Sequence, residues 1–274
     1  MQLRSKILAL AAGLAFAASA QADIKIGVIS SATGPVSLIG IPQKNTVALM
    51  PTEIAGEKVE YITFDDASDP SNTVTLIKKL ISEENIDALV GPSSSPNAMA
   101  VLDFIAEAKV PTLAPVGTIA IVLPMDDKRR WVFKTTQNDG LVADKLFKHM
   151  KETGKKTVGF IGTGDTFGET WYKVAQDYAK KYGIEIVANE RFKRPDTSVT
   201  GQALKVLSAK PDAVLIAAPG GPAVLPQATL TDMGYKGTFY QTHGAALKEF
   251  IKLGGKKVEG TILGGSLMLA PEDA

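Results

Sequence analysis

Short apolar runs alternate with segments of helical periodicity along almost the whole chain, and this alternation is the strongest constraint on the fold. The run Ile24–Ser30 has the length of a buried strand, whereas Thr73–Ile81 places apolar residues at the spacing of one helix face. Strands that alternate with helices form a parallel, doubly wound sheet with right-handed crossovers. The sequence therefore predicts an α/β protein.

The alternation forms two successive series of similar length, which are separated by the polar segment Thr135–Asn138. The strands predicted in the first series are Ile24–Ser30, Val59–Asp66, Ile86–Val90, Thr112–Val116 and Trp131–Thr135. The strands predicted in the second series are Thr157–Ile161, Glu185–Phe192, Ala213–Ala217, Thr238–Thr242 and Thr261–Leu263. We therefore expect two doubly wound lobes at residues 23–136 and 137–265, with residues 266–274 as the start of a return to the first lobe.

Single residues predict two helix boundaries. Pro42 and Pro51 are expected to confine any helix near them to about residues 43–50, because proline disrupts the interior of a helix. Asp139 is expected to cap a helix that continues to Met150, because a carboxylate at this position accepts hydrogen bonds from free amides.

Residues 1–22 have the pattern of a cleavable secretory signal. Arg4 and Lys6 precede an apolar run at residues 7–18, and Ala20-Gln21-Ala22 matches an A-x-A cleavage site. Cleavage before Asp23 would remove both basic residues and change the formal net charge from +1 to −1, which gives no electrostatic reason to expect a nucleic-acid partner. The chain has no cysteine, so disulfides and a thiolate nucleophile are excluded. We expect a soluble periplasmic protein without membrane insertion.

A serine corner, Gly91–Pro96, joins the predicted strand Ile86–Val90 to a helix expected from about Asn97 to Ala108. The free amides and the positive dipole end of a helix N-terminus favour a small anion such as a carboxylate. Ligands of doubly wound sheets bind outside the carboxyl ends of the strands, where this corner lies. A simpler interpretation is also open, in which one serine caps the helix and the others are solvated.

Gly162–Gly168 also follows a strand and precedes a helix, but its spacing is G-x-G-x-x-x-G rather than the dinucleotide-binding G-x-G-x-x-G. We therefore interpret it as a turn in which Asp165 or Thr166 caps the helix. No phosphate-loop, zinc-ligand or nucleophile-elbow motif occurs in the sequence. We expect no cofactor, no metal and no catalytic residue.

The chain has two histidines. His149 lies in a lysine-rich helix, where we expect a solvated side chain. His243 lies at a strand end beside Gly244, and three roles remain open for it: a catalytic base, a ligand-contacting imidazole or a passive loop residue.

Several stretches together resemble one family. They are Asp23–Ser30, Thr33–Pro35, Phe64–Pro70, Gly91–Ser95, Pro115–Thr118 and Phe167–Glu169. With the alternation around them, the whole mature chain is similar to the periplasmic leucine/isoleucine/valine-binding proteins, which are solute receptors of ABC importers with a type I two-lobed fold. The resemblance implies a ligand between the lobes, hinge closure and an inner-membrane ABC permease as partner.

The resemblance also implies roles for single residues. Ser95 and the backbone near Val116 would hold a ligand carboxylate, and Thr118 would contact the same polar head. Phe167 would cover the ligand from the second lobe. His243 stands where the family's amino-acid receptors have an acidic residue that pairs with the ligand's ammonium group. The complete set of candidate ligand-binding residues is Ser94, Ser95, Val116, Gly117, Thr118, Phe167, Gly220 and His243.

Two departures from the family pattern concern the ligand. His243 does not supply the negative charge that a buried ammonium group needs, and Pro219 stands where the amino-acid receptors often have tyrosine. The chain resembles a subgroup with Thr-His-Gly at this strand end, which is associated with aromatic or other hydrophobic carboxylates. We therefore expect such a carboxylate, with a branched-chain amino acid as the alternative if Asp165 or Glu169 reaches the cleft.

We expect a free receptor rather than an enzyme, because binding with hinge closure needs no nucleophile. The alternatives are a ligand-sensing domain of the same fold that feeds a signalling partner, and an exported hydrolase, for which no nucleophile–base pair is evident. The family continues beyond this length with further helices and part of the first lobe. We therefore expect exposed apolar surface on the first lobe, and such surface favours association.

Overall fold

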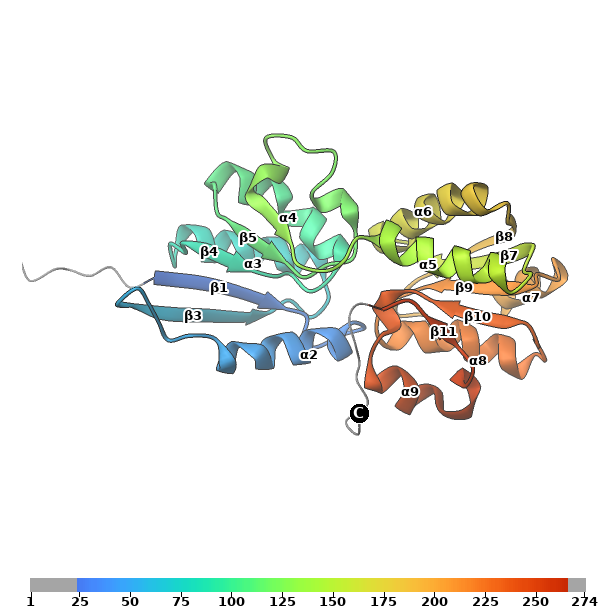
Figure 1. The fold of residues 1–274 in the computed structure, drawn as a ribbon. Helices are drawn as coiled ribbons and strands as arrows, with labels where there is room; N and C mark the ends of the chain where they lie inside the picture. The colour runs from blue at the N-terminus through green and yellow to red at the C-terminus, as the bar shows by residue number, and fades with distance from the viewer. Residues whose placement is uncertain (1–23, 266–274) are drawn as a thin grey trace, which may run out of the picture.

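The computed structural model describes residues 24–265, which form two α/β lobes arranged side by side (Figure 1). The strands of the first lobe are β1 (Ile24–Ser30), β2 (Glu53–Ile54), β3 (Glu57–Asp65), β4 (Ala88–Val90), β5 (Thr112–Ala114) and β6 (Val132–Lys134). Those of the second lobe are β7 (Thr157–Thr163), β8 (Glu185–Phe192), β9 (Ala213–Ala217), β10 (Thr238–Gln241) and β11 (Ile262–Leu263). The predicted signal segment, residues 1–22, and the predicted return segment, residues 266–274, lie outside the described residues.

The strand orders are β2-β3-β1-β4-β5-β6 in the first sheet and β11-β10-β9-β7-β8 in the second. Within residues 24–265 every ladder is parallel except the pairing of β2 with β3. Each sheet therefore needs crossover helices on its faces, which is the doubly wound arrangement. The predicted fold class is confirmed.

Helices connect the strands and cover the sheets. The first lobe contains α2 (Ser37–Thr46), α3 (Pro70–Ser82) and α4 (Ser95–Ala108). The second contains α5 (Asp139–Glu152), α6 (Thr166–Tyr182), α7 (Thr200–Ser208), α8 (Val224–Asp232) and α9 (Lys248–Gly254). In Figure 1, α3 and α4 lie on one side of the first sheet and α2 lies on the other. None of the helices within the described part of the chain is long and apolar enough to cross a membrane.

Buried apolar clusters hold each lobe together. Ile77 of α3, Leu89 of β4 and Ile105 of α4 belong to the cluster of the first lobe. The second sheet has a cluster on each face: Trp171 of α6 belongs to one and Leu230 of α8 to the other. Full burial of one side chain of this kind is worth about 1.5–3 kcal/mol. The sheets are therefore rigid platforms for the loops at their carboxyl ends.

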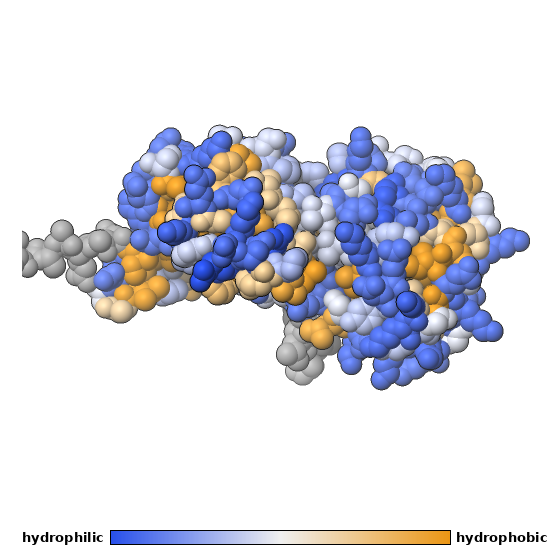
Figure 2. Space-filling model, turned by 90° about the horizontal axis from the view of Figure 1, so that it is seen from above, coloured by the Kyte–Doolittle hydropathy of each residue, from blue (hydrophilic) through white to orange (hydrophobic). Residues whose placement is uncertain are grey.

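The first sheet is less completely covered than the second. Leu113 of β5 and Phe133 of β6 are neighbours across the ladder, and they are 47% and 56% exposed. The first lobe thus carries exposed apolar surface, as the sequence predicts. From above, Figure 2 shows hydrophobic patches within a surface that is mostly hydrophilic on both lobes. Association through such surface stays a prediction.

Two helix predictions are wrong. Helix α2 begins at Ser37 and contains Pro42, which removes only one amide donor. Gly40 packs so closely on the Ser31 carbonyl that no side chain would fit there, so a tertiary contact holds the turn that we expected proline to exclude. At α5, Asn138 occupies the N-cap position, and Asp139 is the first helical residue without a capping hydrogen bond. The two-residue strand β2 is also missing from the predictions, because so short a segment has no periodicity.

Candidate ligand-binding site between the lobes

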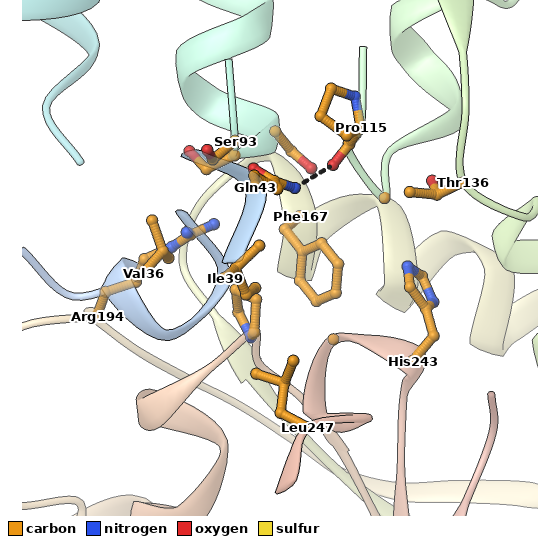
Figure 3. A pocket seen from close by; sticks show the side chains of 15 residues that line it. Val36, Ile39, Gln43, Ser93, Pro115, Thr136, Phe167, Arg194, His243 and Leu247 are labelled. Atoms are coloured by element: carbon orange, nitrogen blue, oxygen red, sulfur yellow. Dashed lines mark hydrogen bonds between the residues drawn. The ribbon is translucent and has the colours of Figure 1, made fainter. Parts of the chain in front are cut away.

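A cavity of about 150 Å³ lies between the two lobes (Figure 3). It is lined by Val36, Ile39, Gln43, Ser93, Ser94, Ser95, Pro115, Gly117, Thr136, Phe167, Arg194, Pro219, His243, Gly244 and Leu247. The lining is apolar on most sides, and its hydroxyl groups are concentrated on the first lobe. Apolar walls with a few convergent polar groups are typical of a site for a small organic molecule.

The serine corner forms the polar wall of this cavity. Ser93 Oγ accepts a hydrogen bond from the Ser31 amide at 3.0 Å, and Ser95 Oγ accepts one from the Thr118 amide at 3.2 Å. Ser94 occupies the N-cap position of α4, but its hydroxyl donates to Asn97 Oδ1 at 2.6 Å and caps no amide. The simpler capping interpretation is therefore wrong. Because Ser93 and Ser95 act as acceptors, their own hydroxyl hydrogens remain available to an anion in the cavity.

A buried carboxylate supports the serine corner from behind. Asp66 is fully buried and accepts hydrogen bonds from the Ser31 hydroxyl at 2.7 Å and the Thr73 hydroxyl at 3.0 Å. The Asn97 side-chain amide donates to the same carboxylate at 2.8 Å, and Asn97 also accepts the hydroxyl of Ser94. The network ties the ends of β1 and β3 to the start of α4. The serine hydroxyls are thus held in place before any ligand binds.

Phe167 and His243 form the opposite wall. Asp165 caps α6, as predicted, by accepting the amides of Phe167 and Gly168, and this capping fixes Phe167 at the helix start. The Phe167 and His243 rings meet edge to face with centroids 6.0 Å apart. Figure 3 shows Phe167 between Ile39 and His243.

Gly117 of the first lobe lies directly against this aromatic pair. A Cβ atom on Gly117 would be 2.6 Å from Phe167 Cε2 and 3.0 Å from His243 Nε2. No other residue would allow the lobes to approach so closely here, because real Cβ atoms do not occur at the shorter distance.

His243 belongs to a buried polar cluster near the passage between the lobes. Burial, with a smaller contribution from the nearby charge of Lys134, lowers the pKa of His243 to about 4, so the imidazole is neutral at pH 7. Its Nε2 lies 3.8 Å from Oδ1 of Asp139, which is fully buried. Burial raises the pKa of Asp139 to about 7, against the opposing effects of the Lys134 charge and the Ile119 amide.

Lys134 completes this cluster. Its Nζ donates to the Thr136 carbonyl at 3.0 Å, the Thr136 hydroxyl at 2.8 Å and the Gln137 carbonyl. Burial lowers the pKa of Lys134, and the charge of Asp139 opposes this shift. Lys134 and Asp139 of this cluster thus lie beside the segment that joins the lobes and do not line the cavity, whereas His243 does.

Five of the predicted site residues line the cavity: Ser94, Ser95, Gly117, Phe167 and His243. The other three, Val116, Thr118 and Gly220, lie beside it. The Val116 carbonyl accepts the Thr136 hydroxyl at 2.6 Å, and Thr118 Oγ1 lies 2.8 Å from Thr170 Oγ1 of the second lobe. The Gly220 amide donates to the Gly244 carbonyl at 2.8 Å.

The acidic residues considered as partners for an ammonium group do not line the cavity. Asp165 caps α6 and pairs with Arg194, and Glu169 pairs with Arg191 at 2.6 Å. His149 does not line this cavity, and its side chain is only partly solvated, in contrast to the prediction of a solvated side chain. It is half-buried, and its Nδ1 lies 2.9 Å from the Tyr240 hydroxyl.

Sequence reasoning missed Gln43 and Arg194. Gln43 lies on α2, which was placed wrongly, and its side-chain amide donates to the Pro115 carbonyl. Arg194 follows β8 by two positions and has no motif around it. Its position after the carboxyl end of a strand is the signal that could have identified it. Within residues 24–265, no group of three or more histidine, aspartate and glutamate side chains could hold a metal ion.

Residues 23–273 match the model of the periplasmic binding protein family. The chain belongs to this family. The resemblance seen in the sequence is therefore confirmed, and the cavity between the lobes lies where doubly wound sheets bind ligands.

Individual relatives agree with this assignment. The periplasmic binding protein described here is 29% identical over 271 residues to a Leu/Ile/Val-binding protein of Rhizobium johnstonii, covering 96% of this chain and 72% of that protein. It is 49% identical to an extracellular ligand-binding receptor from Rhodopseudomonas palustris HaA2, with a TM-score of 0.86 over 88% of this chain and 67% of the other. A solute-binding protein of an ABC transporter from R. palustris, solved with 4-hydroxybenzoate, shares the fold at 24% identity and a TM-score of 0.76, covering 85% of this chain and 65% of that one.

Proposed function

We propose that this periplasmic binding protein is the solute receptor of an ABC importer and that it binds a small hydrophobic or aromatic carboxylate between its lobes. The observation that carries the proposal is the composition of the cavity. Serine hydroxyls line one wall, and a neutral imidazole stands on the other where an amino-acid receptor needs an acid. A carboxylate without an ammonium group suits both walls. The serine hydroxyls can donate to its negative end, and no ammonium group is left beside the imidazole without an acidic partner, which would be strongly disfavoured.

A branched-chain amino acid is the second candidate. Relatives are named for leucine, isoleucine and valine, and another relative was solved with 4-hydroxybenzoate, so both ligand classes occur among similar proteins. Both classes carry a carboxylate, which the serine wall suits. What favours the first class is that, within residues 24–265, no aspartate or glutamate lines the cavity.

The same cavity supports binding rather than catalysis. The relatives are binding proteins, and among the described residues neither histidine has a hydrogen bond to a serine hydroxyl. A receptor that closes on its ligand presents its permease with a different surface when it is occupied. The proposal includes export to the periplasm by the signal at residues 1–22 and binding without a cofactor. A sensing domain of the same fold would bind the same ligand but would signal through a different partner.

Calorimetry with one protein preparation tests the ligand class. We expect benzoate, 4-hydroxybenzoate or 3-phenylpropanoate to bind, and leucine and phenylalanine to bind weakly or not at all. Tight leucine binding together with no binding of the simple carboxylates would refute the proposal. His243→Glu supplies the missing acid, and we expect this variant to gain affinity for leucine.

A further inference from the structure

Arg194 is the basic residue that lines the cavity, and it comes from the loop between β8 and α7 of the second lobe. Its side chain is only 10% exposed. Its Nε donates to Asp165 Oδ2 at 2.5 Å, whereas its Nη2 is buried and has no hydrogen-bond partner. A buried guanidinium N–H without an acceptor destabilises the protein, so an acceptor atom on a bound molecule would supply the hydrogen bond that Nη2 lacks.

Asp165 holds the guanidinium through Arg194 Nε and makes no hydrogen bond to Nη2. Oδ1 accepts the amides of Phe167 at 2.9 Å and Gly168 at 3.3 Å, and it also accepts the Thr163 hydroxyl at 3.0 Å. These donors neutralise part of the carboxylate's charge and fix its position. Asp165 therefore holds Arg194 in place while the outer edge of the guanidinium keeps its positive charge for another partner.

The guanidinium faces the wall that carries the serine corner. Figure 3 shows it extending from the second lobe toward the side of the cavity where Ser93 lies. A carboxylate has two oxygens and about four lone-pair sites, so it accepts hydrogen bonds from both sides at once. Ser93 and Ser95 retain hydroxyl hydrogens on the opposite side.

We propose that Arg194 binds the ligand's carboxylate together with the serine corner, so that the negative end of the ligand bridges the two lobes. This inference rests on the proposed function and adds to it a residue that determines charge specificity. A neutral isostere of the ligand fills the same space but offers the guanidinium no negative charge. Arg194 therefore selects acids over their amides, and its contact is made only when the lobes are closed.

Calorimetry with matched acids and amides tests this inference. The probes are benzoate with benzamide, and 3-phenylpropanoate with 3-phenylpropanamide. We expect Arg194→Gln to weaken binding of the acid by about 10- to 100-fold, the range for a hydrogen bond to a charged group, and to change amide binding by less than about 3-fold. Lys193→Gln is the matched control, because it removes the neighbouring charge from an exposed side chain that does not line the cavity.

The possible outcomes separate this inference from the proposed function. If Arg194→Gln binds the acids as tightly as the unaltered protein, the role of Arg194 is refuted and the proposed function stands. If the unaltered protein binds neither acid, the proposed ligand class fails, and the inference fails with it. A second measurement, guanidinium ¹⁵N NMR of the unaltered protein, does not depend on whether Arg194→Gln folds. The Arg194 resonances, assigned with Arg194→Lys, should shift with benzoate and not with benzamide, and equal shifts would also refute the inference.

Discussion

The hydroxyl oxygen of Thr118 in the first lobe lies 2.8 Å from that of Thr170 on α6 of the second lobe. Thr118 Oγ1 also accepts the Ala120 amide at 3.2 Å, which fixes the position of the hydroxyl that faces Thr170. This contact lies beside the cavity and joins the lobes without a ligand. It therefore contributes to the closed arrangement independently of what is bound.

Thr170→Val should weaken ligand binding without unfolding the protein. One neutral hydrogen bond contributes about 0.5–1.5 kcal/mol, so the apparent affinity for benzoate should fall by about 2- to 10-fold as the closed form becomes less populated. Titration calorimetry measures the affinity for benzoate, and thermal melting checks that the variant stays folded. Thr75→Val is the control, because it removes an exposed hydroxyl that bonds only within α3. Equal losses in the two variants would contradict the role of the Thr118 contact.

Gly117→Ala should oppose lobe closure more strongly. The added methyl group would lie 2.6 Å from Phe167 Cε2, and over-packing of this kind costs about 1–3 kcal/mol. The lobes relieve the contact by opening, so we expect benzoate affinity to fall by about 5- to 100-fold with little change in melting temperature. Gly164→Ala is the matched control, since its Cβ would meet nothing closer than 3.7 Å. Unchanged affinity in Gly117→Ala would show that the lobes do not need this approach.

The fold was largely predictable because buried parallel strands leave a strong local pattern. The bounds of Glu185–Phe192 and Ala213–Ala217 are the same in sequence and structure, since each is a short run flanked by turn residues. Helix α2 was not predictable, because its position depends on the contact between Gly40 and Ser31 rather than on its own sequence. Tertiary contact overrides propensity at such places.

The site was predictable only where it follows strand ends. Ser95 and His243 each come soon after a strand in the chain, so the rule for doubly wound sheets identified their loops. The roles of Asp139 and Arg194 depend on neighbours from distant segments. Asp139 has the sequence pattern of a helix cap, and only the packing of Lys134 and His243 around it shows a buried carboxylate instead.

Asp66→Asn should destabilise the first lobe and loosen the serine corner. Asparagine offers one acceptor oxygen where Asp66 uses two, and each hydrogen bond lost to the charged group costs about 1.5–3 kcal/mol. Asp69→Asn is a close control, because Asp69 caps α3 and asparagine is an equally good N-cap. Urea unfolding measures both variants. Equal stability of the two would mean that the Asp66 network contributes little.

Asp139 and His243, the two groups near the cavity whose pKa values are shifted to about 7 and about 4, should give opposite dependences of stability on pH. The pKa of Asp139 rises from 3.8 to about 7 on folding, so its contribution to stability is present below pH 3.8 and is lost as pH rises to about 7. The pKa of His243 falls from 6.5 to about 4, so its contribution is present above pH 6.5 and is lost as pH falls to about 4. Between about pH 4 and pH 6.5 the two effects offset each other.

Single variants separate these effects when each is compared with the unaltered protein at the same pH. The difference in free energy of unfolding between Asp139→Asn and the unaltered protein should increasingly favour the variant as pH rises from 4 to 7, because the buried carboxylate no longer has to ionise. The same difference for His243→Asn should increasingly favour the variant as pH falls from 7 to 4, because no buried imidazole has to be protonated. Urea unfolding of the ligand-free protein at intervals across this range measures both. Surface carboxylates titrate equally in all three proteins, so they cancel in the differences. If either difference in free energy of unfolding is constant with pH, burial does not shift the pKa of that group as described here.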